Sequence, residues 1–81
     1  MDFYTLIFAQ NPSDADMQAI VQQILIYSQP QIMGRVFEQD GEFVLRFSLR
    51  AHAMRPFEET FRSDVETILG YSVKLDRATR L

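Results

Sequence analysis

The apolar positions change period near the start of the chain, which predicts a strand followed by a helix. In residues 2–10, DFYTLIFAQ, both alternating sets of side chains are largely apolar, as in a strand that is central in its sheet or covered on both faces. After a polar stretch, the apolar residues fall at helical spacing: Met17, Ile20, Val21, Ile24 and Leu25. Ser13, with Asp16 three residues later, resembles a capping box. We therefore expect an amphipathic helix that begins after Ser13 and continues to about Ser28, before Pro30.

Residues 32–50 have the pattern of a β-hairpin whose turn is Asp40-Gly41. Both residues tolerate the positive φ angles that a type I′ turn requires. Counting outward from this turn separates two faces of the hairpin. The face expected under the helices pairs Glu38 with Phe43, Val36 with Leu45, Gly34 with Phe47 and Ile32 with Leu49. The face expected to stay uncovered pairs Gln39 with Glu42, Phe37 with Val44, Arg35 with Arg46 and Met33 with Ser48.

A second helix and a final strand complete the pattern. Pro56 is placed as at a first helical position, and two glutamates follow in the first turn, where the helix dipole favours anions. The apolar stripe of this helix is Phe57, Phe61, Val65, Ile68 and Leu69. Gly70 is expected to end the helix. Residues 71–75, YSVKL, alternate as a strand, and residues 76–81 have the composition of a polar tail.

The predicted order of elements is β-α-β-β-α-β within a single domain, residues 1–81. This order is typical of the α+β class and of the ferredoxin-like sandwich, a four-stranded antiparallel sheet with both helices on one face. The usual strand order of that fold is 4-1-3-2, which makes strands 1 and 3 central. The first strand, apolar on both faces, agrees with a central position.

Composition and charge narrow the classes of function. The chain contains no cysteine, which excludes disulfides and zinc–thiolate sites. A net charge of −3 disfavours a nucleic-acid partner, since such proteins normally carry a basic surface. No apolar run approaches the roughly 18 residues of a membrane span, and the N-terminus lacks the features of a secretory signal. We expect a cytoplasmic protein with no cofactor, no nucleic-acid partner and no membrane contact.

No combination of residues indicates a catalytic or metal site. His52 is the one histidine and falls in a predicted loop, where an exposed structural role is the simpler interpretation. The acidic pairs Asp14/Asp16 and Glu58/Glu59 each fall in the first turn of a predicted helix, so capping and the helix dipole explain them. The chain is therefore expected to have no enzymatic activity and no bound metal.

The uncovered face of the hairpin is the best candidate for a binding surface. It combines Met33, Phe37 and Val44 with Arg35 and Arg46, which the predicted register places directly opposite each other. Opposed like charges are destabilising unless something compensates them. Either both guanidinium groups bend over neighbouring apolar side chains, or a partner covers this face and supplies carboxylates or other acceptors. That partner could be a second copy of the chain.

Two segments carry a resemblance to a known family. In LIFAQNPSDADMQAIVQQI a strand ends in a polar x-Pro loop that leads into a helix, and GRVFEQDGEFVLRFSL is a hairpin of matching length. In this outline, which covers residues 3–75, the chain resembles the ACT-domain family of βαββαβ regulatory modules, which bind amino acids or mediate assembly. The resemblance implies a ligand loop at Asn11, Pro12 and Ser13, with an amino acid as the possible ligand.

The same loop departs from the family's pattern. In the family, a glycine after the proline lets backbone amides approach the carboxylate of an amino acid. Ser13 and Asp14 occupy that place here, and Asp14 and Asp16 would repel a carboxylate. The departure favours a structural or dimerising role over amino-acid binding.

Three hypotheses of function follow. The first is a non-enzymatic, ACT-like regulatory or interaction domain that acts through self-association, by its sheet edges or its open face, or through docking of a protein partner on that face. The alternative is a small stand-alone inhibitor or adaptor, of phage or plasmid type, that docks the same face on an unrelated protein target. The third is an enzyme of unknown type, for which no set of polar residues converges.

Overall fold

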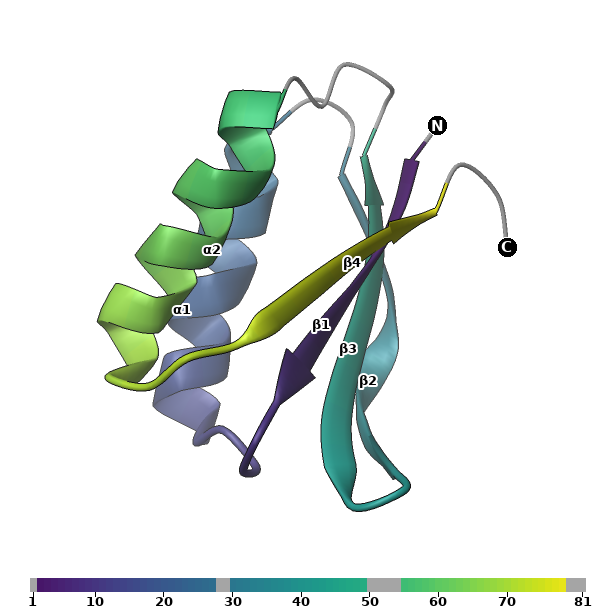
Figure 1. Cartoon of the computed structure of the whole chain (residues 1–81), viewed down its shortest axis with the longest axis vertical. Helices are drawn as coiled ribbons and strands as arrows, with labels where there is room; N and C mark the ends of the chain where they lie inside the picture. The colour runs from purple at the N-terminus through teal and green to yellow at the C-terminus, as the bar shows by residue number, and fades with distance from the viewer. Residues whose placement is uncertain (1, 28–29, 50–54, 79–81) are drawn as a thin grey trace.

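The computed structural model describes residues 2–27, 30–49 and 55–78 and shows one sheet with two helices on the same face (Figure 1). The elements are, in chain order, β1 (Asp2–Phe8), α1 (Asp14–Leu25), β2 (Gln31–Gln39), β3 (Glu42–Leu49), α2 (Arg55–Leu69) and β4 (Lys74–Ala78). All strand pairs are antiparallel. The predicted α+β class, with a four-stranded antiparallel sheet and two helices, is therefore confirmed.

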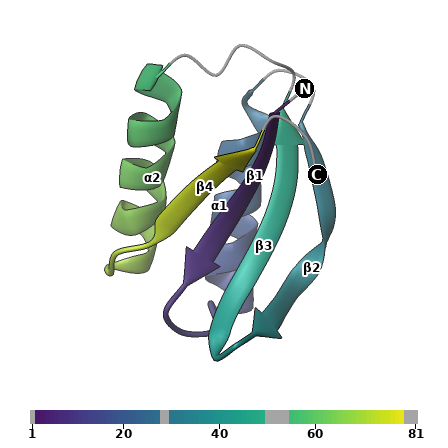
Figure 2. The same cartoon turned by 45° about the vertical axis from the view of Figure 1, so that its right-hand side comes forward.

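The central strands of the sheet are β1 and β3. The strand order is β2-β3-β1-β4, which is 4-1-3-2 when counted from the β4 edge (Figure 2). β1 pairs with β3 on one side and with β4 on the other. Its apolar residues on both faces suit this position, because a central strand has neighbours on both sides and side chains packed above and below.

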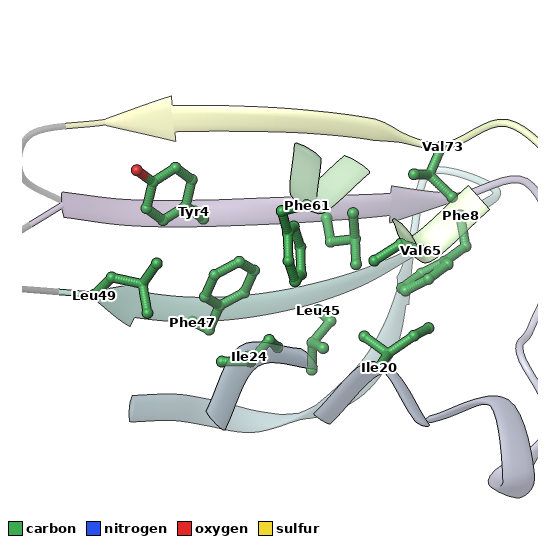
Figure 3. Packing of buried hydrophobic residues seen from close by; sticks show 11 residues of the cluster. Tyr4, Phe8, Ile20, Ile24, Leu45, Phe47, Leu49, Phe61, Val65 and Val73 are labelled. Carbon is green, nitrogen blue, oxygen red and sulfur yellow. The ribbon is translucent and has the colours of Figure 1, made fainter. Parts of the chain in front are cut away.

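The hydrophobic core lies between the sheet and the helices (Figure 3). Its members are Tyr4, Leu6 and Phe8 from β1, Leu45, Phe47 and Leu49 from β3, Ile20 and Ile24 from α1, Phe61 and Val65 from α2, and Val73. The ring of Phe47 is central: it stacks on Tyr4 at 5.3 Å between centroids and meets Phe61 at 5.4 Å. Both helices are therefore held against the same pair of central strands.

The first helix begins as predicted but ends early. The Oγ of Ser13 accepts a hydrogen bond from the backbone N–H of Asp16 at 3.2 Å, as expected for an N-cap. α1 ends at Leu25, with Ile26 as its C-cap. Ser28, where the apolar pattern ended, lies outside the described residues. The prediction that Leu25 belongs to the buried stripe is wrong, because its side chain is 52% exposed.

The connection between α2 and β4 is longer than predicted. Gly70, with φ of +82°, donates its N–H to the carbonyl of Glu66 at 2.8 Å and ends the helix as expected. The Glu66 side chain then accepts the N–H of Val73 at 3.0 Å. Residues up to Val73 are thus used in the connection, and β4 starts at Lys74. The predicted strand 71–75 begins too early, and residues 76–78, assigned to a polar tail, belong to the strand.

Candidate functional site: the open sheet face

A bulge in β2 changes the predicted register of the hairpin. The turn is as predicted, since Asp40 and Gly41 have φ angles of +54° and +81°, and Phe37 lies opposite Val44. The next pair is Met33 with Arg46, so residues 34–36 of β2 face only Leu45 of β3.

Four predicted pairs are therefore wrong. Arg35 does not lie opposite Arg46, nor Gly34 opposite Phe47, Ile32 opposite Leu49 or Met33 opposite Ser48. Instead, Ile32 lies opposite Phe47 and Gln31 opposite Ser48. Gly34 has a φ of +85°, a conformation that glycine adopts without the penalty of a side chain, so it permits the bulge. The apparent opposition of two arginines disappears.

The corrected register arranges the face without helices in three rows across the sheet. We call this surface the open face; its rows are Phe37, Val44, Ile7 and Lys74; then Met33, Arg46, Thr5 and Asp76; then Gln31, Ser48 and Phe3. Four of the five residues of the predicted interaction surface lie here: Met33, Phe37, Val44 and Arg46. Apolar residues of β1, β2 and β3 share this face with Arg46 on the central strand β3 and with Lys74 and Asp76 on the edge strand β4.

The side chains of the open face differ in how far they are exposed to solvent. Val44 is only 5% exposed although no helix covers it, whereas Phe37 on the edge strand is 37% exposed. Phe3, Ile7 and Met33 are half-buried. Isolated exposed apolar residues are normal, but a continuous apolar surface that spans several strands is typical of a binding site.

Arg46 packs over an aromatic ring instead of opposing a second cation. Its Cζ lies 5.2 Å from the ring centroid of Phe37, within the range of a cation–π contact. Of the two interpretations of the arginines, the one in which the guanidinium bends over a neighbouring apolar side chain describes Arg46. The guanidinium is exposed, so its charge also remains available to an anion.

Arg35 lies in the bulge and not opposite Arg46 as predicted. It is also among the residues that line a groove of about 460 Å³ between α1 and β2. The other lining residues are Asn11, Pro12, Asp14, Met17, Val21, Ile32, Gly34, Val36 and Leu45. Two of the three residues of the predicted ligand loop, Asn11 and Pro12, therefore border this groove, while Ser13 caps α1.

The helix side of β4 carries an ion pair. The Nε of Arg77 lies 3.4 Å from Oε1 of Glu58 on α2. Because side chains alternate along a strand, this contact places Asp76 on the opposite, open face, in agreement with its pairing to Thr5. Asp76 was missed in the sequence because β4 contains a single large apolar residue, Leu75, and its alternation is therefore weak.

Tyr4, which lies opposite Arg77 in the sheet, has a strongly raised pKa. Burial raises the pKa of Tyr4 to about 12, with a further contribution from the carboxylates of Asp2 and Glu58 and an opposing one from Arg77. A phenol with so high a pKa stays protonated at neutral pH and cannot serve as a general base there.

Among residues 2–27, 30–49 and 55–78, no group of three or more His, Cys, Asp or Glu side chains could hold a metal ion. His52 lies outside them, as do the side chains of Arg50 and Phe57. Within the same part of the chain, no helix is long and apolar enough to cross a membrane.

Comparison with known proteins gives no relative. No protein-family model matches the chain, no curated protein matches it, and no solved structure matches it.

Proposed function

We propose that the chain is a non-enzymatic, ACT-like interaction domain of ferredoxin-like fold that self-associates through its open face. The observation that carries the proposal is Phe37, a large aromatic residue 37% exposed beside the apolar residues of two further strands. Covering this surface with a second copy removes apolar area from water on both chains at once.

The sheet edges are poorer surfaces for self-association than the face. β2 is interrupted by the bulge at residues 34–36, and bulges hinder edge-to-edge pairing. β4 is five residues long and includes Lys74, Asp76 and Arg77, and charged residues on a short strand have the same effect. Of the two modes of pairing expected from the sequence, the structure therefore favours the face.

Sedimentation velocity over a range of protein concentrations tests the proposal. The wild-type chain is expected to pass from monomer to dimer as concentration rises, and Phe37→Glu is expected to remain monomeric. The matched control is Leu25→Glu, which places the same charge at an even more exposed apolar residue on α1. It should dimerise like the wild type.

Two results would contradict self-association through this face. One is a wild-type chain that stays monomeric up to millimolar concentration, which would favour an adaptor that docks on another protein. The other is equal disruption by both variants, which would place the interface elsewhere. Circular dichroism of each variant shows whether the fold is intact.

A second candidate function is binding of a zwitterionic ligand such as an amino acid in the groove between α1 and β2. The observation that favours it is the presence of Arg35 and Asp14 around one groove with apolar walls, including Val21 and Val36. The guanidinium would bind a carboxylate, and the carboxylate of Asp14 an ammonium group. The bulge supplies the cation that the predicted loop lacks.

Calorimetric titration with apolar amino acids tests this second function. Binding is expected to be lost in Arg35→Gln and kept in Arg62→Gln, an exposed arginine on α2 that does not line the groove. Absence of heat and of thermal stabilisation with every amino acid would retire it.

A further inference from the structure

The open face carries charges of both signs in positions that suit a second copy of itself. In the middle row, Arg46 on β3 and Asp76 on β4 are separated by Thr5 on β1. Neighbouring strands are about 4.8 Å apart, so two strands of separation is about 10 Å along the sheet. The ion pair between Arg77 and Glu58 lies on the other side of the sheet. Arg46 and Asp76 are thus both exposed and both able to reach outward.

We propose that two copies pack open face to open face about a two-fold axis that runs parallel to the strands between β3 and β1, with Arg46 of each copy against Asp76 of the other. This inference rests on the proposed self-association and specifies its geometry. An isologous interface of this kind repeats each contact twice, once on each side of the axis.

The register shows why this axis fits. A two-fold axis along the strands places β4 of one copy over β2 of the other, and β1 over β3. The carboxylate of Asp76 then lies over Met33, one strand away from Arg46 of the other copy. In the neighbouring row, Lys74 lies over Phe37, where an ammonium group can contact the ring.

The apolar residues meet along the same axis. Val44 and Ile7 are the central residues of the row that contains Phe37 and Lys74, so Val44 of each copy lies over Ile7 of the other. Two stacked sheets pack about 10 Å apart, a spacing that side chains of this size fill. The apolar row therefore meets its partner at the axis, and the row that carries Arg46 and Asp76 lies beside it.

The other two-fold axis is less favourable. An axis across the strands, through the middle row, stacks each strand on its own copy. Arg46 would then approach Arg46, and Asp76 would approach Asp76. Like charges brought together at an interface weaken association and select against that arrangement.

A charge-exchange experiment distinguishes the two arrangements. Arg46→Asp alone and Asp76→Arg alone each place like charges together twice in the proposed dimer. Each variant is expected to dimerise roughly tenfold more weakly than the wild type. In an equimolar mixture of the two variants, every cross-interface pair again has opposite signs. The mixture is therefore expected to form heterodimers with near wild-type affinity.

The mixing experiment distinguishes a contact across the interface from a disturbance of the fold of each variant chain. If the substitutions act by disturbing the fold of their own copy, a second damaged copy does not restore association. Arg62→Asp on α2 is the control for a charge reversal away from the face and should leave the dimer unchanged. The heterodimer is measured by sedimentation of one fluorescently labelled variant in the presence of the other.

The outcomes separate this inference from the proposed function. If Phe37→Glu abolishes dimerisation but the mixture does not recover, the open face is the interface and the axis proposed here is wrong. If Phe37→Glu has no effect on a dimeric wild type, the face itself is wrong, whatever the mixture does. Recovery in the mixture together with the loss in each single variant supports the paired Arg46 and Asp76.

Discussion

Tyr4 is a buried residue of β1 whose phenol is affected both by burial and by nearby charged side chains. Its side chain is 1% exposed and its ring stacks on Phe47, with an angle of 16° between the planes. Burial and the nearby carboxylates of Asp2 and Glu58 raise its pKa to about 12. Ionisation of this phenol would place a negative charge at the edge of the core, so the folded state favours the neutral form.

This pKa predicts a loss of stability in strong alkali. Between the unfolded value near 10 and the folded value near 12, the unfolded chain binds fewer protons than the folded chain, so the free energy of unfolding falls as pH rises. The contribution of Tyr4 is complete below about pH 10 and amounts to about 2 kcal/mol lost by about pH 12. Urea unfolding of the wild type and of Tyr4→Phe at several pH values measures it. The variant should lose less stability across this window, and identical pH profiles would contradict the assignment.

Among the helices and strands, α1 shows where the apolar pattern of the sequence and the observed packing differ. Ile24 and Leu25 are neighbours in the sequence and both were expected in the buried stripe. Ile24 is fully buried beneath the sheet, whereas Leu25 points away from the core and is 52% exposed. The stripe is wider than the surface available to cover it, because the sheet and α2 cover only one side of the helix.

A pair of alanine substitutions in α1 tests this difference. Ile24→Ala removes buried methyl groups and leaves a cavity, so it is expected to cost about 2–5 kcal/mol of unfolding free energy. Leu25→Ala is expected to change stability by no more than about 0.5 kcal/mol. Denaturant titration of both variants measures the two values. A large cost at Leu25 would mean that another molecule or another part of the chain covers it in solution.

The bulge in β2 shows the limit of reasoning from alternation. It shifts the register by two residues, and a shift by an even number returns every side chain to the same face. Met33 and Phe37 therefore both lie on the predicted face, although Met33 pairs with Arg46 instead of Ser48, while Phe37 keeps Val44. Gly34 was expected opposite Phe47, but it lies in the bulge, where its positive φ is needed. Neither the apolar pattern nor the turn could reveal that change.

At the scale of the whole molecule, self-association ties thermal stability to concentration. A dimer that dissociates on unfolding gains stability by mass action, so its Tm rises with protein concentration. The wild type is expected to gain several degrees for a tenfold increase in concentration over the range in which it dimerises. Phe37→Glu should show a Tm that does not depend on concentration. Differential scanning calorimetry at several concentrations measures both.

A concentration-independent Tm for the wild type would count against the dimer. The Leu25→Glu variant again serves as the control, because its substitution lies on α1 and should leave the concentration dependence unchanged. Salt provides a further comparison, since screening weakens the exposed charge pairs of the face more than its apolar contacts.

Local signals in the sequence determined the number, type and order of the elements. Ser13 begins α1, Asp40 and Gly41 form the turn, and Gly70 ends α2, each through interactions with residues a few positions away. The period of the apolar residues then separated strands from helices and the inner face of the hairpin from its outer face. These features depend on short-range hydrogen bonds and on backbone conformation, which the identity of a few neighbouring residues decides.

The tertiary structure decided which residues meet across the sheet and how completely they are covered. It placed Arg35 in a bulge, Arg46 over Phe37, and Asp76 in the same row as Arg46. It also left Leu25 exposed. The physical reason is that register and burial depend on contacts between segments far apart in the chain, whose relative positions no local pattern specifies.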